Sequence, residues 1–184
     1  MTSSHSAAKA HLNSIGANTN EVRIEMVCLG NICRSPLAAA VLSNRAAQLT
    51  TPKIIVSSSG TSNYHVGEGA HKLSMKTWQS AGYDYQHVAK QFSVASFESQ
   101  DLILTMDLTN RAMVLSAAKS EEAKAKVFML RQFDPELAHI DPLSREAELL
   151  QVPDPWGEEI DSYQRVLEMI ERAVSGLLTR LDPA

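Results

Sequence analysis

One stretch decides the fold of this chain: Val27-Cys28-Leu29-Gly30-Asn31-Ile32-Cys33-Arg34-Ser35-Pro36. The apolar run that ends at Val27 predicts a buried strand, and Pro36 opens an alanine-rich run that predicts a helix. A cysteine, five residues and an arginine lie between the two. The first N–H groups of a helix lack partners and its dipole favours negative charge. This strand–loop–helix junction therefore predicts an anion-binding site.

The residue types of this loop suit a phosphate pocket. Gly30 and Asn31 tolerate left-handed backbone dihedrals, which a loop needs if its amides are to point inward. Arg34 carries a planar guanidinium that matches two phosphate oxygens, and Ser35 suits the start of the helix. The same positive field would favour the thiolate of Cys28, which is its nucleophilic form. The loop thus predicts a phosphate pocket with a nucleophile at its floor.

The spacing alone is a weak signal, because free cysteines are usually small buried hydrophobes. A Cys-x5-Arg match arises by chance in roughly one such chain in ten. The preceding strand, the internal Gly-Asn and the following Ser-Pro make the match specific. The full string resembles the signature loop of the low-molecular-weight protein tyrosine phosphatases, and the likeness extends over most of the chain from about Val22. It implies a metal-independent phosphatase without a cofactor, which hydrolyses phosphotyrosine in proteins through a phosphocysteine intermediate and releases inorganic phosphate.

The resemblance also implies which residues carry the chemistry. Cys28 would be the nucleophile and Arg34 would bind the phosphoryl group. The remaining phosphate-binding residues would be Leu29, Gly30, Asn31, Ile32, Cys33 and Ser35. A phenolate leaving group, whose conjugate acid has a pKa near ~10, needs a general acid. By resemblance this acid is Asp154, which would then activate water. Asp154 lies between two prolines, and a plain Asp-Pro turn is the alternative interpretation.

Further positions match the family by resemblance. Ser58 and His87 would support the phosphate loop through hydrogen bonds, with His87 in a structural role and not in proton transfer. Tyr64 and Trp156 would form the walls around a phenyl ring, although aromatic residues more often belong to a core. Asp107 is expected to cap a helix N-terminus in preference to contacting the arginine of the loop or the substrate.

Several alternative functions were compared with this one. Gly157 follows Trp156, where many members have a second aromatic residue, and this feature resembles protein-arginine phosphatases. Those enzymes typically have Thr where this chain has Ile32, so Ile32 favours phosphotyrosine. Arsenate reductases of this fold need further cysteines downstream, and none follows Cys33. A non-catalytic phospho-ligand binding module would need neither the nucleophile nor the acid. A nucleotide-binding P-loop is excluded because no Gly-Lys-Ser/Thr follows the strand.

The hydrophobic pattern predicts alternating strands and helices. The predicted strands are 22–27, 54–56, 101–106 and 127–130, and the predicted helices are 37–49, 70–80, 108–118 and 159–181. We expect loops at 57–63 and 131–157 and a solvated, charged face at 119–126. Alternating elements predict an α/β fold of three layers, a four-stranded parallel sheet flanked by helices. The resemblance implies the phosphatase I-like variant with flavodoxin-like winding. We expect one domain over 21–184 and a flexible tail over 1–20.

Composition limits partners and location. With 184 residues and a net charge of −4, nothing favours nucleic acid or an anionic membrane as a partner. Two cysteines cannot form a disulfide framework, so we expect a reducing, cytoplasmic setting and a monomer. Cys33 would be either a redox partner of Cys28 or a pocket filler. Six scattered histidines predict no metal site. The segment 136–151 is interpreted as a tolerated insertion, with a docking surface as the alternative.

Overall fold

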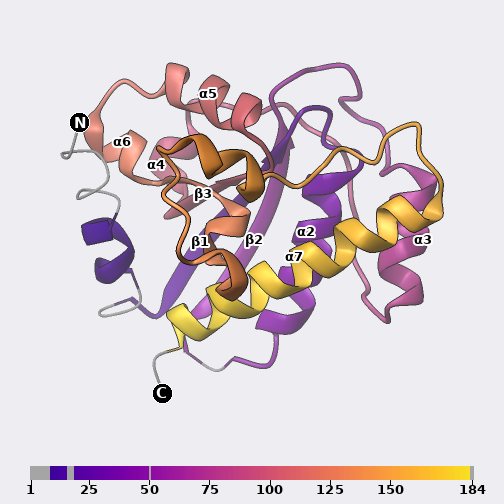
Figure 1. The fold of residues 1–184 in the computed structure, drawn as a ribbon, viewed down its shortest axis with the longest axis horizontal. Coiled ribbons are helices and arrows are strands. Elements are labelled where there is room, and N and C mark those ends of the chain that lie inside the picture. The colour runs from indigo at the N-terminus through magenta and orange to yellow at the C-terminus, as the bar shows by residue number, and fades with distance from the viewer. Residues whose placement is uncertain (1–8, 16–18, 50, 183–184) are drawn as a thin grey trace.

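The computed structural model describes residues 9–15, 19–49 and 51–182 (Figure 1). Its sheet has the strand order β2-β1-β3-β4, and every neighbouring pair is parallel. The strands are β1 (Glu21–Cys28), β2 (Lys53–Gly60), β3 (Leu102–Thr105) and β4 (Val127–Met129). The predicted four-stranded parallel sheet is confirmed, and its order is that of a flavodoxin-like winding.

Helices cover both faces of the sheet (Figure 1). The α-helices are α2 (Arg34–Ala46), α3 (Lys72–Ser80), α4 (Ser96–Ser99), α5 (Leu108–Ala117), α6 (Glu121–Ala125) and α7 (Ile160–Leu181). Three short 3₁₀ helices connect β4 to α7: η1 (Leu130–Phe133), η2 (Pro135–Leu137) and η3 (Arg145–Leu150). The three 3₁₀ helices lie almost wholly in the segment 131–157, for which a loop is predicted, and α6 lies in the segment 119–126, for which only a solvated, charged face is predicted. Their short length gives no sustained periodicity, which explains why the pattern missed them.

The central strand β1 divides the core into two layers, because successive side chains of a strand point to opposite faces. Ile24 and Met26 pack with α2 and α7 in the larger cluster. Val27 points the other way and packs with Phe97 of α4 and Val114 of α5. The sheet is therefore buried on both faces, as expected for a parallel α/β fold.

The second strand is longer than predicted. The predicted strand 54–56 ended before three serines, but β2 continues through them to Gly60, in register with β1 up to Cys28. Ser58 and Ser59 are buried, so their polarity misled the prediction. A Cβ at Gly60 would lie 2.7 Å from the Leu29 carbonyl oxygen. Only glycine therefore lets the end of β2 lie directly against the phosphate loop.

The segment 1–20 was predicted to be a flexible tail, and its residues 1–8 and 16–18 lie outside the described residues. Residues 9–14 are helical. His11 Nε2 lies 2.7 Å from the Asp101 carbonyl oxygen, and Leu12 and Ile15 pack against the larger core cluster. No helix in the described part of the chain is long and apolar enough to cross a bilayer.

Candidate active site

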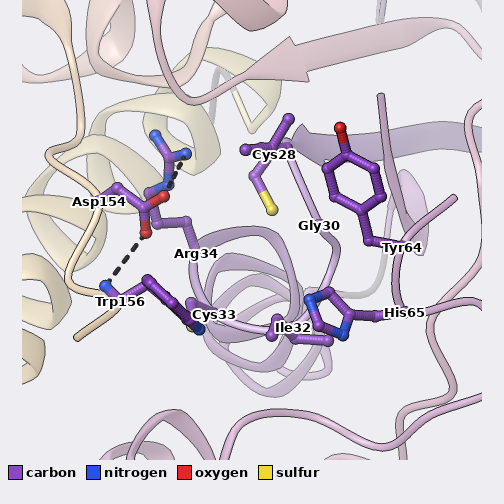
Figure 2. A pocket seen from close by; sticks show the side chains of 10 residues that line it. Cys28, Gly30, Ile32, Cys33, Arg34, Tyr64, His65, Asp154 and Trp156 are labelled. Atoms are coloured by element: carbon purple, nitrogen blue, oxygen red, sulfur yellow. Dashed lines mark hydrogen bonds and ion pairs between the residues drawn. The ribbon is translucent and has the colours of Figure 1, made fainter. Parts of the chain in front are cut away.

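The polar residues of the predicted site meet at one edge of the sheet. Because the strands are parallel, their carboxyl ends lie together, and ligands of such sheets bind outside these ends. Cys28 ends β1, and Asp107 follows β3 directly after Met106. A cavity of about 240 Å³ opens there (Figure 2). Its lining residues are Cys28, Leu29, Gly30, Ile32, Cys33, Arg34, Tyr64, His65, Asp154 and Trp156.

The phosphate loop is held from its outer side by donors to its carbonyl groups. The donors are Ser62 N–H to Leu29, His87 Nε2–H to Asn31, His71 N–H to Ile32 and Ser74 Oγ–H to Cys33, at 2.9, 2.7, 2.8 and 2.7 Å. In a trans peptide the N–H points opposite to the carbonyl. Each outward carbonyl therefore directs the N–H of the next residue inward. Asn31 has a φ of 56°, as the predicted left-handed position requires.

Cys28 lies at the floor of this loop, and its sulfur points into the pocket (Figure 2). The residue is only 2% exposed. The Asn31 backbone N–H donates to Cys28 Sγ at 3.3 Å, and Ser35 Oγ lies 3.0 Å from the same sulfur. Ser35 Oγ accepts from Asn31 Nδ2 at 2.8 Å, which leaves its own proton able to point to the sulfur. The sulfur, which is the atom that would attack phosphorus, is thus held at the floor of the loop by two contacts.

The structure brings the predicted supporting residues together. Asn31 Nδ2 also donates to Ser58 Oγ at 3.0 Å, and Asn31 Oδ1 accepts from the Lys90 backbone N–H at 2.9 Å. The Asn31 side chain is therefore fully engaged, and the loop cannot relax without breaking several bonds. Burial lowers the pKa of His87, although its bond to the Asn31 carbonyl opposes this, and nearby Lys90 lowers the pKa further. His87 is thus neutral, with its proton on Nε2, where the carbonyl requires a donor.

Arg34 is clamped on one edge of its guanidinium and open on the other. Its Nη1 donates to Asp107 Oδ2 at 2.6 Å and to the Val152 carbonyl at 3.1 Å. Nη2 contacts Asp154 Oδ2 at 3.3 Å, and Nε has no partner within the described part of the chain. Burial alone would lower the pKa of Arg34, but the negative charges of Cys28, Asp154 and Asp107 raise it. The edge formed by Nε and Nη2, where Asp154 is the only partner among the described residues, is suited to bind two phosphoryl oxygens once Asp154 moves aside.

Asp107 has two roles, one of which was not expected. As predicted, it caps α5, because Oδ1 accepts from the Asn110 N–H at 2.7 Å. The expectation that capping would replace a contact with Arg34 is wrong, since the other oxygen, Oδ2, binds Nη1. A carboxylate has two oxygens, and the position directly after β3 lets one reach the helix and the other reach the guanidinium.

The predicted acid, Asp154, lines the same pocket as the nucleophile and lies beside Arg34, on the side away from Tyr64 (Figure 2). Its side chain is 43% exposed, and Oδ1 accepts from the Trp156 backbone N–H at 3.2 Å. The strand end positions this loop, because the Val152 N–H donates to the Met106 carbonyl at 2.7 Å. Gly157 has a φ of 83° and turns the chain after the tryptophan. The Asp-Pro sequence is therefore part of the pocket and not a remote turn.

The two aromatic residues expected to form substrate walls, Tyr64 and Trp156, both line the pocket. Trp156 is 65% exposed and Tyr64 is 73% exposed, so neither belongs to a core. His65, which was not predicted, lines the same cavity and pairs with Glu68 through Nδ1 and Oε2 at 2.9 Å. His65 lies in a loop without hydrophobic periodicity, so no pattern in the sequence marks it as a pocket residue.

Cys33 lies on the pocket wall as a free, buried thiol, and Cys28 is also free. Burial raises the pKa of Cys33 to about 11, although its hydrogen bond to Tyr163 opposes the shift. Its Sγ lies 3.5 Å from Tyr163 Oη, which in turn lies 3.0 Å from His71 Nδ1. The hydrophobic pattern of the sequence places Tyr163 only on the apolar face of the last helix, because periodicity does not show where a hydroxyl points. A redox role for Cys33 stays a prediction.

Comparison with known proteins agrees with this geometry. The sequence profile described as "Low molecular weight phosphotyrosine protein phosphatase" matches residues 23–184. The low molecular weight protein-tyrosine-phosphatase of Streptomyces coelicolor is 36% identical over 85% of this chain and 91% of that protein. The chain belongs to the low molecular weight phosphotyrosine protein phosphatase family. The resemblance noted in the sequence is thus confirmed, and with it an enzyme class of phosphatases that act on phosphotyrosine-containing substrates.

Solved structures place this low molecular weight phosphatase among two kinds of relatives. A protein tyrosine phosphatase from Entamoeba histolytica, with Hepes in its active site, has a TM-score of 0.76 and 31% identity, over 88% of this chain and 97% of that one. The YwlE arginine phosphatase from Geobacillus stearothermophilus has a TM-score of 0.73 and 28% identity, over 88% and 94%. The fold is therefore shared by tyrosine and arginine phosphatases, and the pocket must distinguish them.

Proposed function

We propose that this low molecular weight phosphatase hydrolyses phosphotyrosine in proteins by way of a phosphocysteine at Cys28. The observation that carries the proposal is the arrangement at the pocket floor. A thiol with two donors lies below a ring of inward amides and beside the open edge of Arg34. Such a site stabilises the trigonal charge of a phosphoryl group in flight, which is the largest contribution to phosphoryl-transfer catalysis.

In the first step the Cys28 thiolate attacks phosphorus, and the bond between phosphorus and the phenolic oxygen breaks. Arg34 and the loop amides bind the equatorial oxygens. Asp154, in its protonated form, donates its proton to the leaving oxygen, so that tyrosine departs neutral. Its partial exposure and its place in the lining of the same pocket as Cys28 support this role.

In the second step the ionised Asp154 accepts a proton from water while the water oxygen attacks phosphocysteine. The bond between sulfur and phosphorus breaks, the thiolate of Cys28 returns, and inorganic phosphate is released. Among the described residues, no cluster of three or more histidine, cysteine or acidic side chains could hold a metal ion.

Pocket depth favours an aryl phosphate. The sulfur lies at the floor of the cavity, whereas Tyr64 and Trp156 stand largely exposed at its mouth. A phenyl ring fits between such walls and delivers its phosphorus to the floor, which a short serine phosphate would not do. Ile32, an apolar wall residue, also suits a ring better than a guanidinium. Phosphoarginine is the second candidate substrate. Gly157 stands where many family members have a second aromatic residue, and its lack of a side chain makes that wall of the pocket lower.

We further propose that the protein acts as a monomer in the cytoplasm. The residues assigned to catalysis, Cys28, Arg34 and Asp154, line one cavity of a single chain, so the proposed mechanism needs no residue from a second copy. Both cysteines are free thiols, and a nucleophilic thiolate requires a reducing compartment to persist.

The test is a Cys28→Ser variant assayed on phosphotyrosine, phosphoarginine and arsenate under one set of conditions. We expect the wild type to act on phosphotyrosine most efficiently, and the variant to lose turnover by at least about ten-thousandfold while still binding inorganic phosphate. Turnover at the wild-type level in the variant would contradict the mechanism. A preference for phosphoarginine in the wild type would replace the substrate but keep the mechanism.

A further inference from the structure

A second cavity, of about 620 Å³, lies away from the catalytic pocket and shares none of its lining residues. It is surrounded by five parts of the chain: the helical segment 9–14, α5, α6, the segment 138–143 and the end of α7. Its volume is in the range of ligand-binding sites. Its apolar lining residues include Leu12, Leu115, Phe128, Phe133, Ile140 and Leu143. We call this cavity the basic groove because of the charges along it.

The basic groove carries a local excess of positive charge in an acidic protein. Four cationic side chains line it, together with one acidic side chain, Glu121. Glu121 is already bound to Lys124 at 2.7 Å. The remaining three cations are Lys9, Arg111 and Arg180. The whole chain has a net charge of −4, so the charge along this groove is opposite in sign to the net charge of the molecule.

Arg111 is the strongest indication that an anion belongs in the groove. The residue is partly buried on α5, and its Nε is shielded from solvent with no hydrogen-bond partner in the described ranges. Burial lowers its pKa, because no carboxylate compensates the lost hydration. A desolvated guanidinium without a counter-charge is unfavourable, and a carboxylate bound beside it would remove that cost.

The groove is built from two parts of the chain that catalysis does not use. Residues 9–14 precede the region 23–184 that matches the phosphatase family. Residues 138–143 belong to the segment 136–151, which the sequence predicted to be an insertion, with a docking surface as the alternative. Lys9 and Ile140 bring the two parts to one cavity. Their convergence favours the docking alternative.

We propose that the basic groove binds an acidic peptide segment, with apolar side chains, of a partner protein. The cations come from the helical segment 9–14, α5, α6 and α7 and so require several separate negative charges, which an acidic peptide has and a single fatty-acid carboxylate lacks. The chain's own residues 1–8, Met-Thr-Ser-Ser-His-Ser-Ala-Ala, hold no acidic side chain and lack the complementary charge. Such a peptide would place its apolar side chains on the floor and its carboxylates beside Arg111 and Arg180.

Binding in the groove leaves the catalytic pocket open. Arg180 lies at the end of α7, and Lys124 lies in α6, which leads into the start of β4. Helices of a parallel α/β fold run back from the carboxyl ends of the strands, so these positions lie toward the opposite edge of the sheet. A bound partner could therefore remain attached while a phosphorylated side chain enters the pocket.

The experiment measures the binding of a fluorescein-labelled peptide of alternating Glu and Leu to the full chain by anisotropy, with inorganic phosphate present to occupy the catalytic pocket. We expect the wild type to bind this peptide and not its Lys/Leu counterpart. The Arg111→Glu and Arg180→Glu variants should each weaken binding by about tenfold or more. Lys53→Glu is the control, because it makes the same charge change on β2, the edge strand farthest from β4. It should weaken peptide binding by less than about twofold.

Turnover of a small aryl phosphate should be unchanged in all three variants, which shows that they fold. Four outcomes would overturn the proposal. They are the absence of peptide binding, equal binding in the Arg111→Glu variant, equal weakening by Lys53→Glu, and binding of dodecanoate in place of the peptide. Sedimentation would also overturn the proposal if it showed a dimer that Arg111→Glu abolishes, because the groove would then bind a second copy of the chain.

Discussion

The two halves of the active site differ in how firmly the fold holds them. The phosphate loop is buried and bonded at nearly every position, with Asn31 wholly inaccessible and Arg34 3% exposed. The loop that carries Asp154 and Trp156 is open to solvent and is held mainly through Val152, whose N–H and carbonyl bind Met106 and Arg34. The half that binds the anion is thus preorganised, whereas the half that donates the proton is more exposed and has fewer hydrogen bonds.

This difference matches the demands on each half. Charge stabilisation requires donors that stay in place while the reaction proceeds, because reorganising them would cost free energy. Proton transfer involves first the leaving group and then water, and both can reach a carboxylate that is partly exposed. The contact between Arg34 and Asp154 at 3.3 Å joins the halves before substrate binds. It must loosen when a phosphoryl group takes the open edge of the guanidinium.

The largest effect is expected from weakening the rigid half. In Arg34→Lys, an ammonium replaces the fork and leaves Asp107 without one of its partners. We expect kcat/KM to fall by about a hundredfold to a thousandfold for every aryl phosphate, whatever its leaving group. Steady-state kinetics on a series of substituted phenyl phosphates measures this. Arg23→Lys, an exposed arginine paired with Glu21, is the matched control and should leave the kinetics unchanged.

Changing the open half should have a smaller and selective effect. Asp154→Asn keeps an oxygen for the Trp156 N–H but removes the transferable proton. We expect kcat/KM, which reports only the first step, to fall by about a hundredfold or more for phenyl phosphate and much less for nitrophenyl phosphates, whose leaving groups need no acid. A plot of log kcat/KM against leaving-group pKa should steepen. Equal slowing of all substrates would contradict the acid role, and Asp161→Asn, an exposed carboxylate of α7, serves as control.

The smallest expected effect concerns how the rigid half is supported. The folded pKa of His87 is below its ordinary value, so the unfolded chain takes up the proton first as pH falls. The stability that His87 contributes is therefore full above about pH 6.5 and is lost as the solution becomes more acidic. Glutamine can donate to the Asn31 carbonyl without titrating. His87→Gln should thus lose less stability than the wild type between neutral and acidic pH.

Urea unfolding at a series of pH values measures this difference. The exposed His139→Gln variant is the control and should keep the pH dependence of the wild type. If His87→Gln and the wild type lose stability in parallel, the neutral His87 is not what supports the loop.

The sequence predicts the phosphate loop and its flanking elements better than it predicts the residues around them. The order of β1, phosphate loop and α2 follows from local signals, because an apolar run, Gly30-Asn31 and Ser35-Pro36 act within ten residues of each other. The family resemblance predicts a supporting role for Ser58. The sequence does not predict that β2 extends through Ser58, because a run of serines is typical of a loop. The double use of Asp107 was missed because a sequence does not show that a capping carboxylate has a second oxygen facing an arginine.

Long-range placement accounts for the rest. His71 and Tyr163 are 92 residues apart, and their stacked rings behind Cys33 depend on how α3 and α7 pack. The basic groove likewise depends on residues 9–14 meeting the segment 138–143. No local pattern encodes such meetings, because they result from the packing of whole elements.

The most direct test of the central claim is to trap the covalent intermediate. Asp154→Ala, with an activated aryl phosphate as substrate, should form phosphocysteine faster than water can remove it. Rapid acid quenching followed by peptide mass spectrometry should then find one phosphoryl group on Cys28 and none on Cys33. Release of phosphate without any modified cysteine, or modification at Cys33, would contradict the account.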